Sequence, residues 1–233
     1  MSKEIRGSLS KEISGTQPLP TDWADWISGR SFACTGGSSS LRQGLLHHVP
    51  LNSLSDESAV RKMHSALTEV SPLVAEQGSE FMSLLFTFED DCGDDAAGFH
   101  EELWAGMRSL RRIDRTQGYQ QAPGSSSDLR SPWFAISAAE TAYFVLGLHP
   151  RSDRFARRSP GAGLVFNSHL QFDRLRARGV YEPMKKRIRE RERRLQPEAN
   201  PTSTDFGQAT EAPQYSGWIP HGWQPKSTDH IAF

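Results

Sequence analysis

Apolar residues recur at helical spacing in several segments of the chain. In residues 56–74, Met63 and Leu67 fall four positions apart, which places them on one face of a helix. Asp22 and Asn167 each precede such a segment and are predicted to cap it. Helices are therefore predicted over 22–27, 56–74, 99–113, 167–178 and 181–195.

Short apolar runs without helical spacing predict strands. Residues 81–88, FMSLLFTF, have the length and the aromatic content of a buried strand. The runs 133–137 and 141–148 are separated by a few residues, which predicts an antiparallel hairpin. Residues 164–166 predict one more short strand.

The mixture of helices with a few short strands predicts a single α+β domain with a small, mainly antiparallel sheet packed with helices. Residues 1–21 are polar and are predicted to be a flexible leader. The folded domain is expected to span 22–218, followed by a tail over 219–233. Its last part is expected to wrap around the core, because it is rich in aromatic residues: Phe206, Tyr215, Trp218 and, in the tail, Trp223.

Composition excludes several classes of protein. The 233 residues carry a net charge of -1, which gives no general attraction to nucleic acid or to membranes. The chain contains no run of about 18 apolar residues, so no membrane-spanning helix is predicted. The N-terminus has no apolar core of a secretory signal, and two cysteines are too few for a disulfide framework. A reduced, cytoplasmic protein is therefore expected, with no membrane and no nucleic-acid partner.

Residues 141–172 bring two histidines close to a group of arginines. His149 follows an apolar strand and is fixed by the proline behind it, and His169 lies in the first turn of a helix, where the dipole favours a neutral ring. Four arginines between them offer forked donors for carboxylates: Arg151, Arg154, Arg157 and Arg158. The segment could hold an iron and its anionic groups, or it could be an ordinary loop with solvated charges.

Two other segments allow a chemical and a structural interpretation. Residues 32–44, FACTGGSSSLRQG, are rich in glycine and serine, which permits close approach of the backbone to a ligand. Cys34 in this segment is either a thiolate stabilised by backbone N–H groups or a buried, inert thiol. The basic run 185–194 is interrupted by Glu190 and Glu192, so a solvated helix face is favoured over a nucleic-acid contact.

The chain resembles the YqcI/YcgG family. The resemblance lies in FVLGLHPRSDRFARRSPGAGLVFNSHLQFDRLRARGVYEPMKKRIRERERRLQ and in NPTSTDFGQATEAPQYSG, with weaker blocks at FACTGG and FHEELWAGMRSLRRID. It covers about residues 30–218. It implies a haem-dependent oxygenase that uses O2 and external electrons to N-hydroxylate a guanidine or amine nitrogen, as in making hydroxyarginine for D-cycloserine or a guanidine precursor of guanitoxin.

The family motifs fall on residues that carry the expected roles. Non-covalent b-type haem is implied, with His149 as the preferred iron ligand, His169 as the second choice and Cys34 as the third. The chain has no Cys-x-x-Cys-His, so covalent attachment is excluded. Arginines of the same segment are expected to pair with the haem propionates: Arg154, Arg157 and Arg158.

The tail motif is expected to supply the substrate site. Asp205 and Glu211 are the carboxylates implied for a guanidinium, which needs a forked acceptor. Asn167 and Tyr215 are expected to orient ligand or oxygen. A redox partner of the ferredoxin or flavodoxin reductase type is implied as the electron source.

The chain departs from the family pattern in four places. Proline and tryptophan stand at Pro213 and Trp218, where arginine is usual, and a Gly-Ser-Ile run is replaced at 197–199. Ala139 and Glu140 replace the usual Gly-Gly turn. Two other functions compete with the enzyme: a non-catalytic haem or iron sensor with the same ligands, and a nucleic-acid- or protein-binding module that uses the 185–194 helix.

Overall fold

A five-stranded mixed sheet forms the centre of the computed structural model, which describes residues 13–77, 81–198, 200 and 203–218. The strand order is β1-β2-β5-β4-β3. β1 and β2 pair in parallel, and the other neighbours pair antiparallel. The α+β fold with a mainly antiparallel sheet is confirmed. The strands are β1 (Leu46–Leu51), β2 (Ser83–Phe88), β3 (Ile136–Ala138), β4 (Thr141–Leu148) and β5 (Gly163–Ser168).

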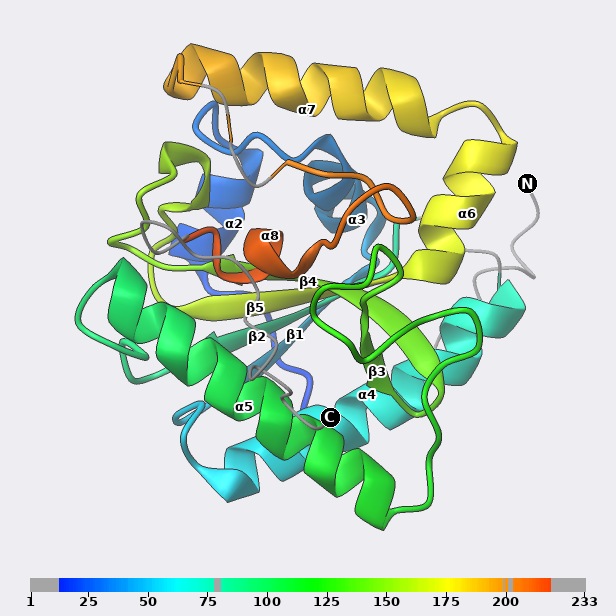
Figure 1. The fold of residues 1–233 in the computed structure, drawn as a ribbon. Helices are drawn as coiled ribbons and strands as arrows, with labels where there is room; N and C mark the ends of the chain where they lie inside the picture. The colour runs from blue at the N-terminus through cyan, green and yellow to red at the C-terminus, as the bar shows by residue number, and fades with distance from the viewer. Residues whose placement is uncertain (1–12, 78–80, 199, 201–202, 219–233) are drawn as a thin grey trace, which may run out of the picture.

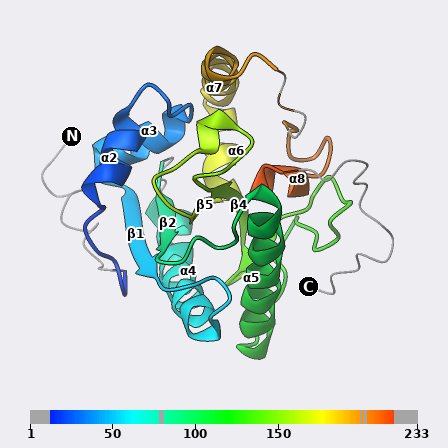
Figure 2. The same ribbon diagram turned by 90° about the vertical axis from the view of Figure 1, so that its left-hand side faces the viewer.

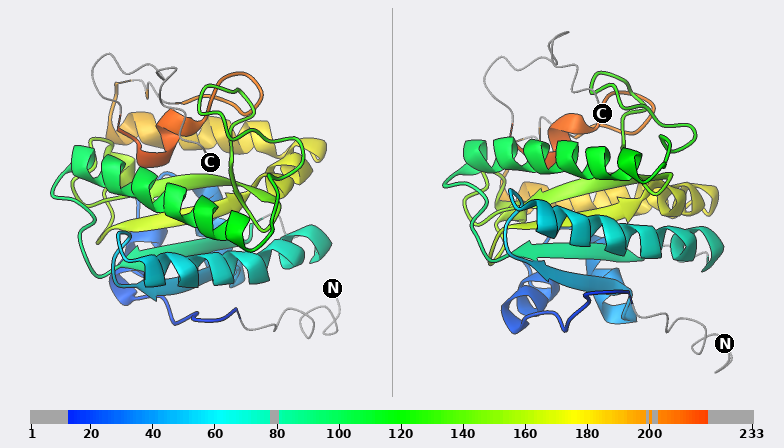
Figure 3. Two further views of the ribbon diagram at one scale, coloured as in Figure 1. Left: turned by 60° about the horizontal axis from the view of Figure 1, so that its bottom comes forward. Right: turned by 90° about the horizontal axis from the view of Figure 1, so that it is seen from below.

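Two long helices cover one face of the sheet. α4 (Glu57–Gln77) and α5 (Ala96–Thr116) lie side by side beneath it (Figure 3). Their apolar stripes pack on Tyr143 and Phe166 of the central strands, and these residues are fully buried. Burial of apolar surface on this scale is the main stabilising term of the fold.

The opposite face is covered by shorter helices (Figure 2). α7 crosses above the sheet at a distance, with α3 and the segment before α8 between them (Figure 1). Strand β4 alternates fully buried residues towards α4 and α5 with half-buried Phe144 and Leu146 on this side. The helices are α2 (Thr21–Ser28), α3 (Thr35–Gln43), α6 (His169–Ala177), α7 (Tyr181–Leu195) and α8 (Ala212–Ser216), with a 3-10 turn η1 (Phe155–Arg157).

Several local predictions are wrong. The glycine- and serine-rich stretch 32–44, for which no helix is predicted, contains helix α3, and the strand β1 is not predicted either. Asn167 lies in β5, and Ser168 caps α6 by accepting from the Leu170 N–H. Within the predicted leader, Ile13 is buried and the Ser14 N–H donates to Glu69, so this part packs on the body.

The geometry of the β3–β4 turn shows why glycine suits the two positions at which this chain has alanine and glutamate. Ala139 and Glu140 have φ angles of 47° and 56°, which are positive values that glycine adopts most easily. The turn is held by the buried Asp114, which accepts from the Ala139 N–H at 2.8 Å. Among the described residues, no helix is long and apolar enough to cross a membrane. Residues 1–12 and 219–233, predicted as leader and tail, lie outside the described residues.

Candidate functional site

A cavity of roughly 210 Å³ lies on the side of the sheet that faces α7. Its walls come from α3, the half-buried face of β4 and β5, α6, α7 and the segment 200–214. Apolar side chains form much of the lining: Phe32, Phe144, Leu146, Phe172, Leu175 and Ile188.

Cys34 places a thiol in the wall of this cavity. It is the N-cap residue of α3, and its Sγ accepts a hydrogen bond from the Gly37 N–H at 3.3 Å. Burial raises the pKa of the thiol above its ordinary value, and the charge of Glu192 adds to this, whereas the backbone N–H groups of Gly37 and Gly36 and the charge of Arg191 oppose it. The free thiol is therefore neutral, and the helix N-terminus would stabilise the sulfur as a thiolate once its proton is removed.

Two buried acceptors in the lining have no hydrogen-bond partner within the described part of the chain. They are the Oε2 of Glu211 and the Oε1 of Gln171. Burial raises the pKa of Glu211 to about 8, because the charged carboxylate is poorly solvated there. Buried polar atoms are nearly always paired, so two unpaired acceptors on one cavity indicate a ligand that donates hydrogen bonds.

His169 lies beside Glu211 in the same region. Its Nε2 is 3.5 Å from the Glu211 Oε2, and the Phe206 ring lies over it with centroids 4.2 Å apart. Neither ring nitrogen has a hydrogen-bond partner among the described residues. Burial lowers the pKa of His169 to about 3, so the ring is neutral at physiological pH. The ring is not among the described side chains that line the cavity.

Two other predicted residues also line the cavity. Asp205 forms an ion pair with Lys185 of α7 at 2.8 Å, which ties the tail segment to the helix. The Asn167 Oδ1 accepts a hydrogen bond from the Ser83 hydroxyl at 2.7 Å. Asp205, Glu211, Asn167 and Cys34 therefore meet at one cavity, although they lie far apart in the sequence.

Comparison with known families gives one result. The model of the YqcI/YcgG family matches residues 23–220. The chain belongs to the YqcI/YcgG family. No curated protein and no solved structure matches the chain significantly.

His149, in the Gly-Leu-His-Pro motif of this YqcI/YcgG chain, is a structural residue. The Nε2 donates to the carbonyl oxygens of Asp91 at 2.9 Å and Gly93 at 3.2 Å. The Nδ1 accepts from the Arg151 N–H at 3.1 Å, and the ring stacks on Phe99. Both nitrogens are thus committed to the backbone, and the ring is not among the described residues of the cavity wall. The geometry does not support the preference for His149 as iron ligand.

The predicted propionate arginines are engaged elsewhere. The Arg157 Nη1 donates to the carbonyl oxygen of Gln214 at 2.5 Å, so it holds the C-terminal end of α8. The Arg158 Nε donates to the carbonyl oxygen of Ser152, and the Arg154 Nη1 donates to that of Glu198. Only Arg157 of the three is part of the described cavity wall.

Tyr215 lies in the core and is not among the described residues of the cavity wall. Its side chain is fully buried against Trp104, and its hydroxyl donates to the carbonyl oxygen of Tyr143 at 3.2 Å. Gly147 allows this packing, because a Cβ atom there would lie 2.7 Å from the Tyr215 carbonyl oxygen. The Gly-Leu-His-Pro and Gln-Tyr-Ser-Gly motifs of the family thus build the contact between β4 and α8.

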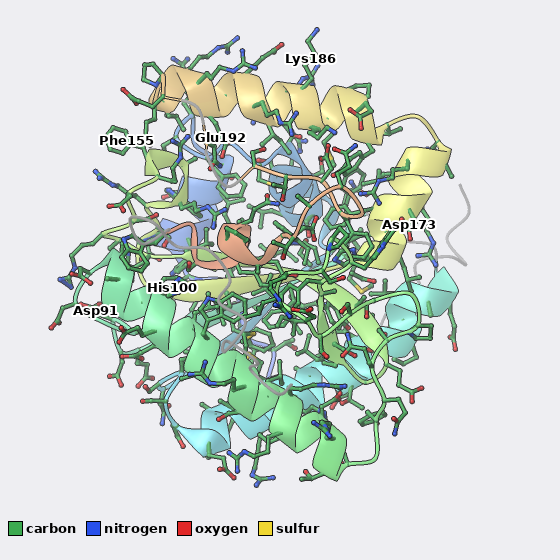
Figure 4. The ribbon with its side chains drawn as sticks, viewed as in Figure 1. Asp91, His100, Phe155, Asp173, Lys186 and Glu192 are labelled. Atoms are coloured by element: carbon green, nitrogen blue, oxygen red, sulfur yellow. The ribbon has the colours of Figure 1, made fainter. Side chains whose placement is uncertain are left out.

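Residues missed from the sequence include Gln171, Lys185 and Glu192, all of which line the cavity. Gln171 lies within the FN-x-H-x-QF motif, and its place two positions after the predicted ligand His169 is the available clue. Glu192 interrupts a basic run in the sequence, and that pattern gives no sign that its side chain faces a cavity. Figure 4 shows that Glu192 points inward from α7, whereas Lys186 projects away from the molecule.

The residues of the cavity fit a haem by their chemistry. The wall supplies a thiol, an apolar lining and nearby cations, which match an iron, a porphyrin face and carboxylates. No group of three or more metal-binding side chains occurs among the described residues. The enclosed volume is below the range of about 300–1,000 Å³ found for ligand pockets, so a porphyrin would extend beyond it. To admit the rest of the porphyrin, α7 would have to shift outward. This helix has no fully buried side chain, so the shift would not expose the core.

Proposed function

We propose that this protein is a haem-dependent oxygenase that hydroxylates a guanidine or amine nitrogen. The observation that carries the proposal is the composition of one cavity. A thiol at a helix N-terminus lies in the same wall as two buried acceptors without partners, Glu211 and Gln171. Membership of the YqcI/YcgG family supports the proposal.

Cys34 is the ligand that we assign to the haem iron. Among the three predicted ligands, it is the one whose side chain lines the cavity within the described residues. Coordination would remove the thiol proton, and the Gly37 N–H and the α3 dipole would stabilise the resulting thiolate. A thiolate ligand donates electron density that favours cleavage of the O–O bond, which is the chemistry that bound haem supplies.

Glu211 and Gln171 are the residues that we assign to the substrate. A guanidinium has five N–H donors and no acceptor, so it satisfies both unpaired oxygens. The cation also lowers the pKa of Glu211, so the carboxyl group releases its proton on binding and becomes a charged partner. Asp205 is already paired with Lys185, so we assign it to fixing the cavity wall.

The overall reaction requires an electron donor outside this chain. One oxygen atom of O2 enters the N–H bond, and the other leaves as water, which takes up two electrons and two protons. A ferredoxin or flavodoxin system of the cytoplasm would supply the electrons. Glu211, whose pKa burial raises to about 8, would release a proton from its Oε2 when the cation binds and take one up when the product leaves.

The proposal is tested with haem-supplemented protein, a ferredoxin reductase system and a panel of arginine and related guanidines. We expect a product heavier by one oxygen atom, detected by mass spectrometry, and its loss in Glu211→Ala. Asp173→Ala is the matched control, because it removes an exposed carboxylate of α6 (Figure 4). A protein without a Soret band after supplementation would contradict the proposal. Tight haem binding without turnover of any guanidine or amine would instead indicate a sensor.

A further inference from the structure

A second hollow, of roughly 970 Å³, lies between α3 and α7 and opens to solvent. We refer to it as the arginine groove. Its lining includes five arginines, Arg30, Arg42, Arg187, Arg191 and Arg194. No acidic side chain lines it within the described part of the chain, and none of the five forms a salt bridge there. Five like charges around one hollow repel one another, so the groove is suited to an anion.

The facing surface of α3 adds hydroxyl donors to these charges. Thr35, Ser38 and Ser39 lie on one helical stripe with Arg42, and all four line the groove. The Thr35 hydroxyl is buried, and it has no hydrogen-bond partner among the described residues. Two helices that pack usually meet along an apolar seam, whereas α3 and α7 face each other across hydroxyl groups and guanidinium groups.

The arginine groove adjoins the cavity that contains Cys34. Phe81 and Met184 line both spaces. A Cβ atom on Gly36 would lie 3.7 Å from the Met184 Sδ and 3.8 Å from the Cys34 Sγ, so the two sulfur atoms flank the same glycine. Arg191 of the groove is also close enough for its charge to favour the thiolate form of Cys34. A ligand that spans both spaces would need an apolar body and an anionic end.

We propose that the arginine groove binds the two propionate carboxylates of the haem whose iron is held at Cys34. The inference rests on the proposed function and adds a binding site to it. The groove arginines take the role of propionate partners in place of Arg157 and Arg158, whose guanidinium groups already donate hydrogen bonds to backbone carbonyl oxygens. Arginine suits carboxylates because its planar fork donates two parallel hydrogen bonds.

The test compares haem with haem dimethyl ester, in which both carboxylates are capped and uncharged. Affinities are measured by Soret titration of the wild-type protein and of the double variant Arg187→Ala/Arg191→Ala. We expect haem to bind about tenfold or more weakly to the variant, and the ester to bind both proteins equally. Added salt should weaken binding of haem to the wild type and leave the ester unaffected.

Two further proteins complete the test. Arg108→Ala/Arg115→Ala removes two arginines from a depression on α5, on the other side of the sheet, and should bind haem as the wild type does. Arg187→Lys/Arg191→Lys keeps the charge and should recover most of the affinity. Equal loss of haem and ester in the alanine variant, or no loss of either, would overturn the assignment of the groove. If the wild type binds neither molecule, the proposed function fails as well, and circular dichroism of each variant separates loss of binding from loss of folding.

Discussion

Hydrogen bonding distinguishes the residues that could bind a metal from those whose donor atoms are already engaged. His149 was the most attractive ligand by sequence, because a strand and a proline fix its position. Its two ring nitrogens are nevertheless occupied by three backbone groups. Cys34 was the least favoured of the three, and it is the one in the cavity wall. Sequence identifies side chains that can bind iron, but it does not show which of their atoms are already bonded.

His149→Ala should therefore lower stability without changing iron ligation. Removal of the buried ring takes the donor from the carbonyl groups of Asp91 and Gly93 and leaves a gap beside Phe99, which costs about 2–3 kcal/mol of the free energy of unfolding. Urea unfolding measures the loss, and the haem spectrum should keep its wild-type form. His47→Ala, which removes a half-buried ring, is the control and should cost less than about 1 kcal/mol. A His149→Ala protein that is as stable as the control would contradict the structural role.

Glu211 should make the haem-free protein less stable as the pH rises. Its pKa is about 8 in the folded state against an ordinary value of 4.5, so the native state binds more protons between these values and loses stability as pH increases through them. His169 acts in the opposite sense, because its pKa of about 3 lies below 6.5 and stability falls as the pH drops through this range. Stability should therefore be greatest between about pH 4.5 and 6.5 with respect to this pair.

Glu211→Gln tests the alkaline side of this profile. The amide cannot ionise, so the variant should exceed the wild type in stability by about 1 kcal/mol or more at pH 8, and differ little at about pH 5. Unfolding midpoints in urea across this range provide the measurement. Glu76→Gln, which changes an exposed carboxylate of α4, should leave the profile unaltered. A parallel profile for Glu211→Gln and wild type would show that the carboxyl group is charged in the folded protein.

At the level of elements, the helices with strongly periodic apolar residues were predictable. Short elements without such a pattern were not. The long amphipathic helices α4, α5 and α7 follow their apolar spacing closely. α3 was missed because glycine and serine favour loops, and its formation depends on the Cys34 cap and on packing against α7. β1 was missed because its histidines and proline hide a strand that pairs in parallel with β2. In both cases tertiary contacts outweigh local preference.

The close contact between β4 and α8 is tested by a substitution at Gly147. In Gly147→Ala the new Cβ atom would lie 2.7 Å from both the Tyr215 carbonyl oxygen and the Phe99 ring. We expect a loss of about 1–3 kcal/mol in the free energy of unfolding, because neither neighbour can move without disturbing the core. Gly161→Ala is the matched control, since the nearest atom to its Cβ would be 3.9 Å away. Equal stability of the two variants in urea would contradict the close packing of α8.

At the level of the whole molecule, the sheet separates a fully packed core on one face from the candidate site on the other face. α4 and α5 bury one face completely, and the other face keeps the half-buried side chains that line the cavity (Figures 2 and 3). The sequence predicted the fold class and five of the residues that line the cavity: Cys34, Arg157, Asn167, Asp205 and Glu211. It could not predict that residues from α3, β5 and the 203–214 segment meet at one place, because that depends on how the chain crosses the sheet.

The ligation of haem by Cys34 is the central claim, and the absorption spectrum of the reduced, carbon monoxide-bound protein tests it most directly. The account predicts the red-shifted Soret band of thiolate ligation in the wild type and in His149→Ala. Cys34→Ala should lose this band, and Cys34→His should move it to the position typical of histidine ligation. A wild-type spectrum retained in Cys34→Ala would contradict the account.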